Sequence, residues 1–278
     1  APRFDYGRQP HETHITEHGA VFTTPVLTLT LHTVRDQDNE RHAQVSTTAS
    51  GDVHVIFELR AGQQRGLVLE SAASGPPRDI ANAEFDRLLE ETSGFWRSWL
   101  AQSTYTGRWR EALQRSAITL KLMTYAPTGA LVAAPTAGLP EQVGGERNWD
   151  YRYTWVRDGS FSVYALLGMG FTEEAAAFGR WLRDRIEEQA GGEGGPLKIM
   201  YRVDGSSDLT EEPLEHWEGY RGSRPVRIGN GASDQRQMDI YGEAVDSIHF
   251  ADLHGLALGH RGWIALHSII DWLTDNWD

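Results

Sequence analysis

The first part of the chain has the alternating pattern of β-strands. In the segment AVFTTPVLTLTLHTV (residues 20–34), Val26, Thr28 and Thr30 alternate with Leu27, Leu29 and Leu31, a period of two that is typical of a strand with one buried face. Two more short runs rich in β-branched residues, GDVHVIFELR and RGLVLESA, are separated by polar and glycine-containing turns. The pattern predicts a β-rich region over residues 1–80.

From Asn82 onward the apolar residues recur at spacings of three and four, which is the period of helices. The first such stretch has an apolar stripe that must pack against something, so we expect a linker helix within residues 81–105 rather than a free linker. A second helix is predicted from about residue 108 to 125. Further helices are predicted at residues 160–169, 172–189, 233–253 and 262–277.

Two long polar loops lie between these helices. The first is APTGALVAAPTAGLPEQVGGERNWDYRYTW (residues 126–155), and the second is PLKIMYRVDGSSDLTEEPLEHWEGYRGSRPVRIGNGA (residues 196–232). Long structured loops in compact domains are usually functional. The alternation of helices with such loops is typical of a helical barrel whose loops build a site at one end.

Composition and charge narrow the possible partners. The chain has 278 residues, enough for one large domain or two ordinary ones. Its formal charge of −13 argues against nucleic acid or an anionic membrane as partner. The absence of cysteine excludes disulfides, thiol catalysis and cysteine metal sites. No run of 18 apolar residues predicts a membrane span, and the first residues show no signal-peptide pattern, so we expect a cytoplasmic protein.

The stretch RNWDYRYTWVRDGSF (residues 147–161) concentrates aromatic and charged residues. An arginine beside an aspartate can hold adjacent hydroxyls of a sugar, because the guanidinium donates through a rigid fork while the carboxylate accepts. Trp155 or Tyr151 would then supply a flat ring for stacking on the sugar. The alternative is a buried arginine–aspartate network that only orders a loop. The ten tryptophans leave the same choice between a helical core and a carbohydrate cleft.

Other site chemistries are not supported by the sequence. It contains no phosphate loop, no His-Glu-x-x-His motif and no nucleophile elbow. His11 and His14 could suggest a metal site, as could Asp239, Glu243 and Asp246 on one helix face, but solvent-exposed side chains are the simpler interpretation of both patterns. We therefore expect neither a metal nor an organic cofactor.

The two segments RNWDYRYTWVRDGSF and YRGSRPVRIGNGASDQRQMDIYGE resemble glycoside hydrolase family 15, which contains glucoamylases, glucodextranases, bacterial trehalases and isomaltose-cleaving relatives. The resemblance is greatest to bacterial trehalase-like members and covers almost the whole chain. It implies a multidomain protein, β and then all-α. The C-terminal part of a β-sandwich would occupy residues 1–80, a linker helix residues 81–105, and the first half of an (α/α)6 catalytic barrel residues 106–278.

The resemblance also implies roles for individual residues in gripping the non-reducing glucose. Tyr151 matches the aromatic residue beside the reacting carbon, and Trp155 matches a ring that contacts the sugar. Arg157 and Asp158 match the pair that holds the glucose hydroxyls. A second sugar-facing loop is matched by Arg227 and Asn230.

The family uses two glutamates to invert the anomeric centre, and both motifs would follow Asp278, so we assign no catalytic residue in this chain. We expect an internal portion of an inverting, exo-acting α-glucosidase that releases glucose from trehalose, isomaltose-type α-1,6 or maltose-type α-1,4 substrates. Its partners would be an α-glucosidic disaccharide or oligosaccharide and the missing remainder of the enzyme. That remainder could be a separate chain. The alternative is a non-catalytic carbohydrate-binding protein with the same glucose-gripping loops.

Overall fold

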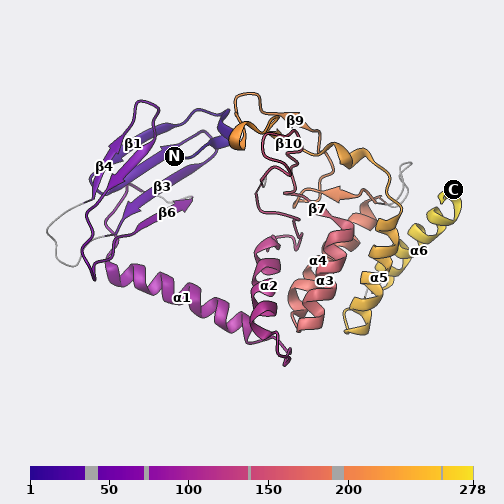
Figure 1. The fold of residues 1–278 in the computed structure, drawn as a ribbon. Helices are drawn as coiled ribbons and strands as arrows, with labels where there is room; N and C mark the ends of the chain where they lie inside the picture. Colours follow the sequence, from indigo (N-terminus) through magenta and orange to yellow (C-terminus); the bar gives the residue numbers. More distant parts are fainter. Residues whose placement is uncertain (35–42, 72–74, 137–138, 190–196, 258, 278) are drawn as a thin grey trace. The chain divides into compact units, whose positions relative to one another are not determined.

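The computed structural model describes all residues except 35–42, 72–74, 137–138, 190–196, 258 and 278 (Figure 1). Ala72, at the end of one predicted strand, and Asp278 therefore lie outside the described residues. The chain forms two compact units, residues 1–97 and residues 98–278. Strands come first and helices follow, which confirms the predicted order. The predicted boundaries at residues 80 and 105, the β-sandwich and the (α/α)6 barrel stay predictions.

The first unit is built on an antiparallel sheet. Its strand order is β1-β2-β3-β6, made of β1 (Glu12–Thr16), β2 (Gly19–Thr23), β3 (Thr28–Thr33) and β6 (Leu67–Ser71). A separate hairpin pairs β4 (Gln44–Thr47) with β5 (Val53–Ile56). Phe4, Ala20 and Phe22 form a small buried core.

The alternation in β3 is real, but the threonine face is the more deeply buried one. Thr30 and His32 are buried, whereas Leu29 and Leu31 are only half-buried against the small core. The segment that leads into α1 explains this. The Arg78 N–H donates to Nδ1 of His32 (3.1 Å), and the Ile80 N–H donates to the carbonyl of Thr33 (2.9 Å). The chain after β6 thus supplies a hydrogen bond to the buried ring of His32, whereas the buried hydroxyl of Thr30 has no hydrogen-bond partner among the described residues.

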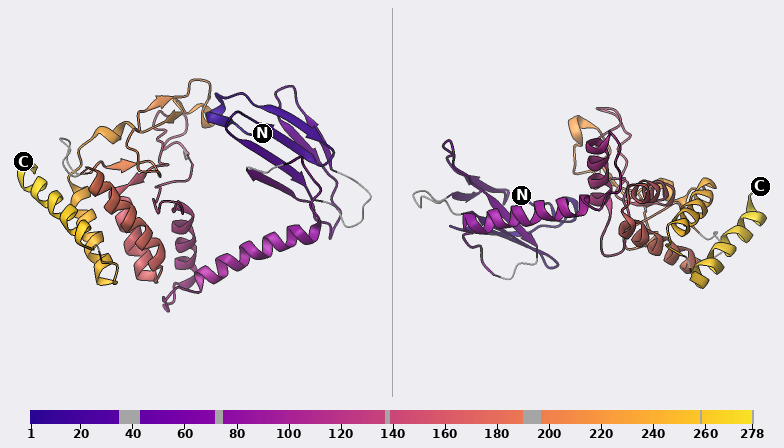
Figure 2. Two further views of the ribbon diagram at one scale, coloured as in Figure 1. Left: turned by 180° about the vertical axis from the view of Figure 1, so that it is seen from behind. Right: turned by 90° about the horizontal axis from the view of Figure 1, so that it is seen from below.

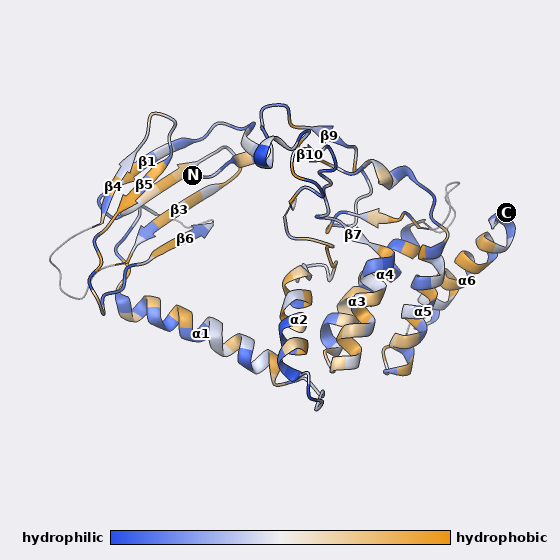
Figure 3. Cartoon of the chain, in the orientation of Figure 1, coloured by the Kyte–Doolittle hydropathy of each residue, from blue (hydrophilic) through white to orange (hydrophobic). Residues whose placement is uncertain are grey.

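The helices follow in the order α1 (Asn82–Leu100), α2 (Arg110–Met123), α3 (Val156–Met169), α4 (Thr172–Gln189), α5 (Asp239–Leu253) and α6 (Gly259–Asn276). In the second unit α3 and α5 lie side by side and run in the same direction, while α4 and α6 pack together and run the opposite way (Figures 1 and 2). Apolar residues, orange in Figure 3, line α3 and α5. Val163, Leu166 and Leu167 on α3 are buried among these helices. The helix layers bring the loops at the N-terminal ends of α3 and α5 to one end of the unit.

The largest differences from the predicted helix starts are in α3 and α5, and α6 begins at Gly259 instead of residue 262. α3 begins at Val156, four residues earlier than expected, because Val156 is itself buried and starts the apolar period. α5 begins at Asp239 rather than near residue 233, and the preceding residues Gly231–Asp234 form a short 3-10 helix capped by Asn230. The early start of α3 matters for function because it moves Arg157 and Asp158 from a loop into a helix.

The last turn of α1 is anchored to α4 by a buried cluster. The ring of Trp99 stacks on Phe171 with 4.0 Å between ring centroids and an angle of 12°. Its indole N–H donates to Oε1 of Glu174 (2.8 Å), which also accepts from Nζ of Lys121 on α2 (2.5 Å). One buried carboxylate thus joins three helices.

Glu174→Gln is expected to reduce the loss in free energy of unfolding that occurs as the pH falls into the acidic range. Burial raises the pKa of Glu174, but the hydrogen bonds from Lys121 and Trp99 outweigh it and hold the pKa below its ordinary value. Because the folded-state pKa is lowered, this stabilisation is present above the unfolded pKa of about 4.3 and is lost as pH falls through the folded pKa.

The test is chemical unfolding of wild type and variant from about pH 7 to about pH 3. The stability difference between the two proteins should be largest near neutral pH and shrink on acidification. Glu173→Gln, at the exposed neighbouring position, is the control and should follow the wild-type curve. A constant difference over the whole range would show that Glu174 is not charged in this cluster.

Candidate functional site

A short strand before α3 fixes the start of the site. Trp155 lies in β7 (Thr154–Trp155), which pairs antiparallel with β8 (Met200–Tyr201) from the second long loop. The next residue, Val156, donates its N–H to the carbonyl of Ile199 (3.1 Å). Since both sides of this pairing are buried, α3 begins from a rigid support. Arg157 and Asp158 therefore occupy its first turn, where the helix dipole favours an acidic side chain.

The two predicted aromatic residues lie next to each other. The ring centroids of Tyr151 and Trp155 are 5.6 Å apart with an angle of 46° between the planes. Tyr151 is 40% exposed, while Trp155 is 9% exposed. Tyr151 is thus the more accessible of the two rings, and its predicted stacking on a sugar stays a prediction.

The charged pair makes contacts in two directions. Nη2 of Arg157 is 3.3 Å from Oδ2 of Asp158, and Nη1 is 3.0 Å from Oδ2 of Asp239 at the start of α5. Nη1 also donates to Oε1 of Gln237 (3.4 Å). The hydrogen bond to Asp239 raises the pKa of Arg157 above its ordinary value, and the negative charge of Asp158 raises it as well. The guanidinium and the carboxylate of Asp158 are both partly exposed, so both can meet a ligand.

A second arginine–aspartate pair has the loop-ordering role that the sequence left open. Asp150 is 1% exposed and accepts from Nε (2.8 Å) and Nη2 (2.6 Å) of Arg152. It also accepts from the hydroxyl of Tyr153 (3.1 Å), which in turn accepts from the N–H of Gly229 (2.9 Å). Burial and the nearby charge of Asp150 raise the pKa of Tyr153. The loop-ordering interpretation therefore applies to Asp150 and Arg152, while the sugar-holding role of Arg157 and Asp158 stays a prediction.

Asn230 takes part in the same network. Its side-chain N–H donates to the carbonyl of Asp150 (3.1 Å), and its Oδ1 accepts from the N–H of Ala232 (3.0 Å). With 6% exposure, it joins the second loop to the first through the nitrogen of its amide and caps the following 3-10 helix through the oxygen. Its predicted contact with sugar stays a prediction, and the geometry shows a supporting residue.

Arg227 lies in β10 (Arg227–Ile228), which pairs with β9 (Glu212–Pro213). Its Nε is 3.0 Å from Oε1 of Glu211, and its Nη1 donates to the carbonyl of Glu146 (2.8 Å). The guanidinium carbon lies 4.8 Å from the centroid of the Trp149 ring, a cation–π distance. Arg227 thus fastens the second loop to the first, and its predicted role in binding sugar stays a prediction.

Residues 107–278 match the family described as glycosyl hydrolases family 15. The chain belongs to glycosyl hydrolases family 15. All the residues of the candidate site lie within the matched range. The two loops that meet at the starts of α3 and α5 therefore belong to the part of the chain that matches the family.

The curated relatives carry the name trehalase. The chain is 46% identical over 175 residues to Trehalase of Thermoplasma acidophilum, a match that covers 63% of this chain and 29% of that protein. It is 45% identical over 203 residues to Trehalase of Mycobacterium tuberculosis, covering 73% and 30%. With Trehalase 1 of Sulfolobus acidocaldarius the identity is 30% over 282 residues, covering 99% and 46%. The chain thus spans less than half the length of these relatives, and no solved structure matches it.

Two residues of this family 15 site were not predicted. The sequence places Asp239 on the helix after the second loop and on an acidic helix face with Glu243 and Asp246, but it gives no sign of a role at the site, and it gives no signal for Gln237. In the structure Asp239 pairs with Arg157, and Asp246 accepts from the hydroxyl of Tyr164. Among the described residues, no group of three metal-ligating side chains could hold a metal ion. The same part of the chain has no helix that is long and apolar enough to cross a membrane.

Gly159 allows the first turn of α3 to approach α4 closely. A Cβ on Gly159 would lie 2.3 Å from the ring of Phe178, which is buried. We expect Gly159→Ala to destabilise the protein by about 1–3 kcal/mol, because overpacking must displace the ring or the helix. Gly168→Ala on the same helix is the matched control, since a Cβ there meets nothing within 4 Å. It should be neutral or stabilise the protein by up to about 1 kcal/mol. Urea unfolding measures the change in the free energy of unfolding for both variants. Equal changes would refute the close packing of Gly159 against Phe178.

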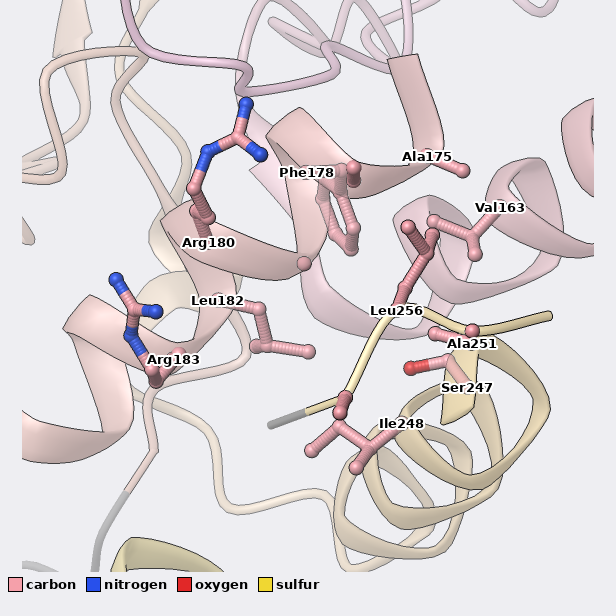
Figure 4. Close-up of a pocket in the computed structure, with 14 residues that line it drawn as sticks. Val163, Ala175, Phe178, Arg180, Leu182, Arg183, Ser247, Ile248, Ala251 and Leu256 are labelled. Carbon is pink, nitrogen blue, oxygen red and sulfur yellow. The ribbon is translucent and has the colours of Figure 1, made fainter. Parts of the chain in front are cut away.

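A cavity of about 310 Å³ lies farther down the helices (Figure 4). Its walls come from α3, α4, α5 and residues 255–257. Val163, Phe178 and Leu256 face into it, while the guanidinium groups of Arg180 and Arg183 point away. Most of its lining residues are apolar, so the cavity offers few side-chain partners to a sugar, whose hydroxyls each need a hydrogen bond. The exposed loop residues at the other end of α3 are the better candidate site.

Proposed function

We propose that the full-length protein hydrolyses trehalose to glucose. The observation that supports this most is the group of Tyr151, Arg157 and Asp158 at the start of α3, in a family 15 chain whose curated relatives are trehalases. Isomaltose-type α-1,6 and maltose-type α-1,4 glucosides are the next substrates in order. The reaction would remove one glucose from the non-reducing end.

In this proposal the described residues bind and orient the glucose unit. Arg157 donates to neighbouring hydroxyls through two parallel N–H groups, and the partly exposed carboxylate of Asp158 accepts from others. The exposed face of Tyr151 packs on the apolar face of the ring, with Trp155 behind it. Hydrogen bonds of this kind hold the anomeric carbon in position for attack.

The cleavage step would require two carboxyl groups. One protonates the glycosidic oxygen, and the other removes a proton from the water that attacks the opposite face of the sugar. We assign neither role to a residue of this chain, and propose that both lie in the part of the protein that corresponds to the longer relatives. We also propose that the layers α3/α5 and α4/α6 belong to an (α/α)6 barrel that surrounds the site.

Glucose release by the full-length protein from trehalose, isomaltose and maltose tests this function. The configuration of the first glucose formed, followed by proton NMR, tests the mechanism. Inversion at one carbon of α,α-trehalose gives one β-glucose and one α-glucose, whereas retention gives α-glucose only. Release from trehalose with equal initial amounts of both anomers is expected. Binding of these sugars without hydrolysis would support the non-catalytic alternative instead.

A further inference from the structure

Asp239 is the residue through which α5 reaches into the site on α3. It is the first residue of α5, and its carboxylate lies 3.0 Å from Nη1 of Arg157, which is 82 positions away in the sequence. Gln237, just before the helix, accepts from the same nitrogen at 3.4 Å. Asp239 also lies in the first turn of the helix, where the helix dipole favours a negatively charged side chain. Arg157 is therefore held from two helices at once.

The position of the guanidinium decides how much of Asp158 remains available. Arg157 lies between two carboxylates, with its shorter contact to Asp239 at 3.0 Å and its longer contact to Asp158 at 3.3 Å. An adjacent arginine and carboxylate can also close into a bidentate pair, which occupies both carboxylate oxygens. Asp239 opposes that closure because it attracts Nη1 toward α5.

We propose that Asp239 is a positioning residue that limits Arg157 and Asp158 to their single 3.3 Å contact and prevents a closed bidentate pair, so that both keep hydrogen-bonding capacity for sugar hydroxyls. This inference rests on the proposed function of the site. Without Asp239, Asp158 becomes the nearest charge partner of Arg157, and the two should pair with each other rather than with the ligand. An amide in place of the carboxylate keeps an acceptor for Nη1 but loses the charge, so it should preserve part of the effect.

The test uses the full-length protein with Asp239→Ala and Asp239→Asn. Asp239→Ala is expected to lower kcat/KM for the best disaccharide substrate by about tenfold or more, mainly through a higher KM, with Asp239→Asn in between. Asp252→Ala, an exposed acid at the other end of α5, is the control and should leave kcat/KM unchanged.

A double-mutant comparison separates positioning from a general structural role. If Asp239 acts by keeping Asp158 open, Asp239→Ala should have little further effect in a protein that already carries Asp158→Ala. Additive losses would overturn the proposal. A crystal structure of Asp239→Ala gives a decision that does not depend on activity: Arg157 should turn onto Asp158 in a bidentate pair. An unmoved guanidinium would overturn the inference, even if trehalose hydrolysis is confirmed.

Discussion

Replacing Arg157 with alanine is expected to lower kcat/KM for trehalose by about 10- to 150-fold, the loss that corresponds to one charge-assisted hydrogen-bonding group worth about 1.5–3 kcal/mol. The guanidinium is partly exposed and lies beside the accessible carboxylate of Asp158, so it can donate to a bound hydroxyl. Its removal also leaves Asp158 and Asp239 without their shared counter-charge. Binding and turnover should therefore fall together.

Steady-state kinetics on the full-length protein measures this effect, with Arg180→Ala as control. Arg180 is an exposed arginine on α4 whose side chain points away from the cavity in Figure 4. The control should retain wild-type kcat/KM. If Arg157→Ala did the same, the placement of Arg157 in the glucose subsite would be wrong.

The fold order and the residue types of the site could be predicted from sequence because they depend on local signals. A period of two gives way to periods of three and four near Asn82, and the motif around Trp155 is long enough to indicate its family. The start of α3 was missed because the long polar loop before it has no helix-capping residue at Trp155. A strand pairing with Met200, rather than a cap, supports that helix start.

Contacts between the two long loops could not be predicted in the same way. Asn230 and Asp150 are 80 positions apart, and nothing in either segment shows that the amide of one binds the carbonyl of the other. The resemblance indicated these two segments, but it did not indicate which of their residues are exposed and which are buried between the loops. The structure separates the exposed residues Tyr151 and Asp158 from the buried ones that hold the loops in place.

Asp150→Ala is expected to produce the largest loss of stability among single changes at this site. The carboxylate is buried and receives hydrogen bonds from Arg152 and Tyr153. Removing one partner of a buried ion pair costs about 3–5 kcal/mol. We expect about 3 kcal/mol here, at the low end of that range, because Arg152 is partly exposed and can turn toward water.

Urea unfolding measures the global effect, with Asp184→Ala as the control. Asp184 forms an exposed ion pair with Arg183, so its loss should cost less than about 1 kcal/mol. Asp150→Asn, which keeps the shape and one acceptor, should fall between the two. Comparable losses for Asp150→Ala and Asp184→Ala would mean that the buried network does not stabilise the fold.

Hydrogen exchange shows whether the loss is concentrated where the two loops meet. The amide N–H of Gly229 donates to the hydroxyl of Tyr153, and that hydroxyl is held by Asp150. In Asp150→Ala the Gly229 amide should exchange faster by more than the global loss of stability accounts for, because the second loop is released locally. Amides in the middle of α4 should follow the global stability only. The loop that presents Tyr151 and leads into α3 would then depend on a buried carboxylate that a ligand does not reach.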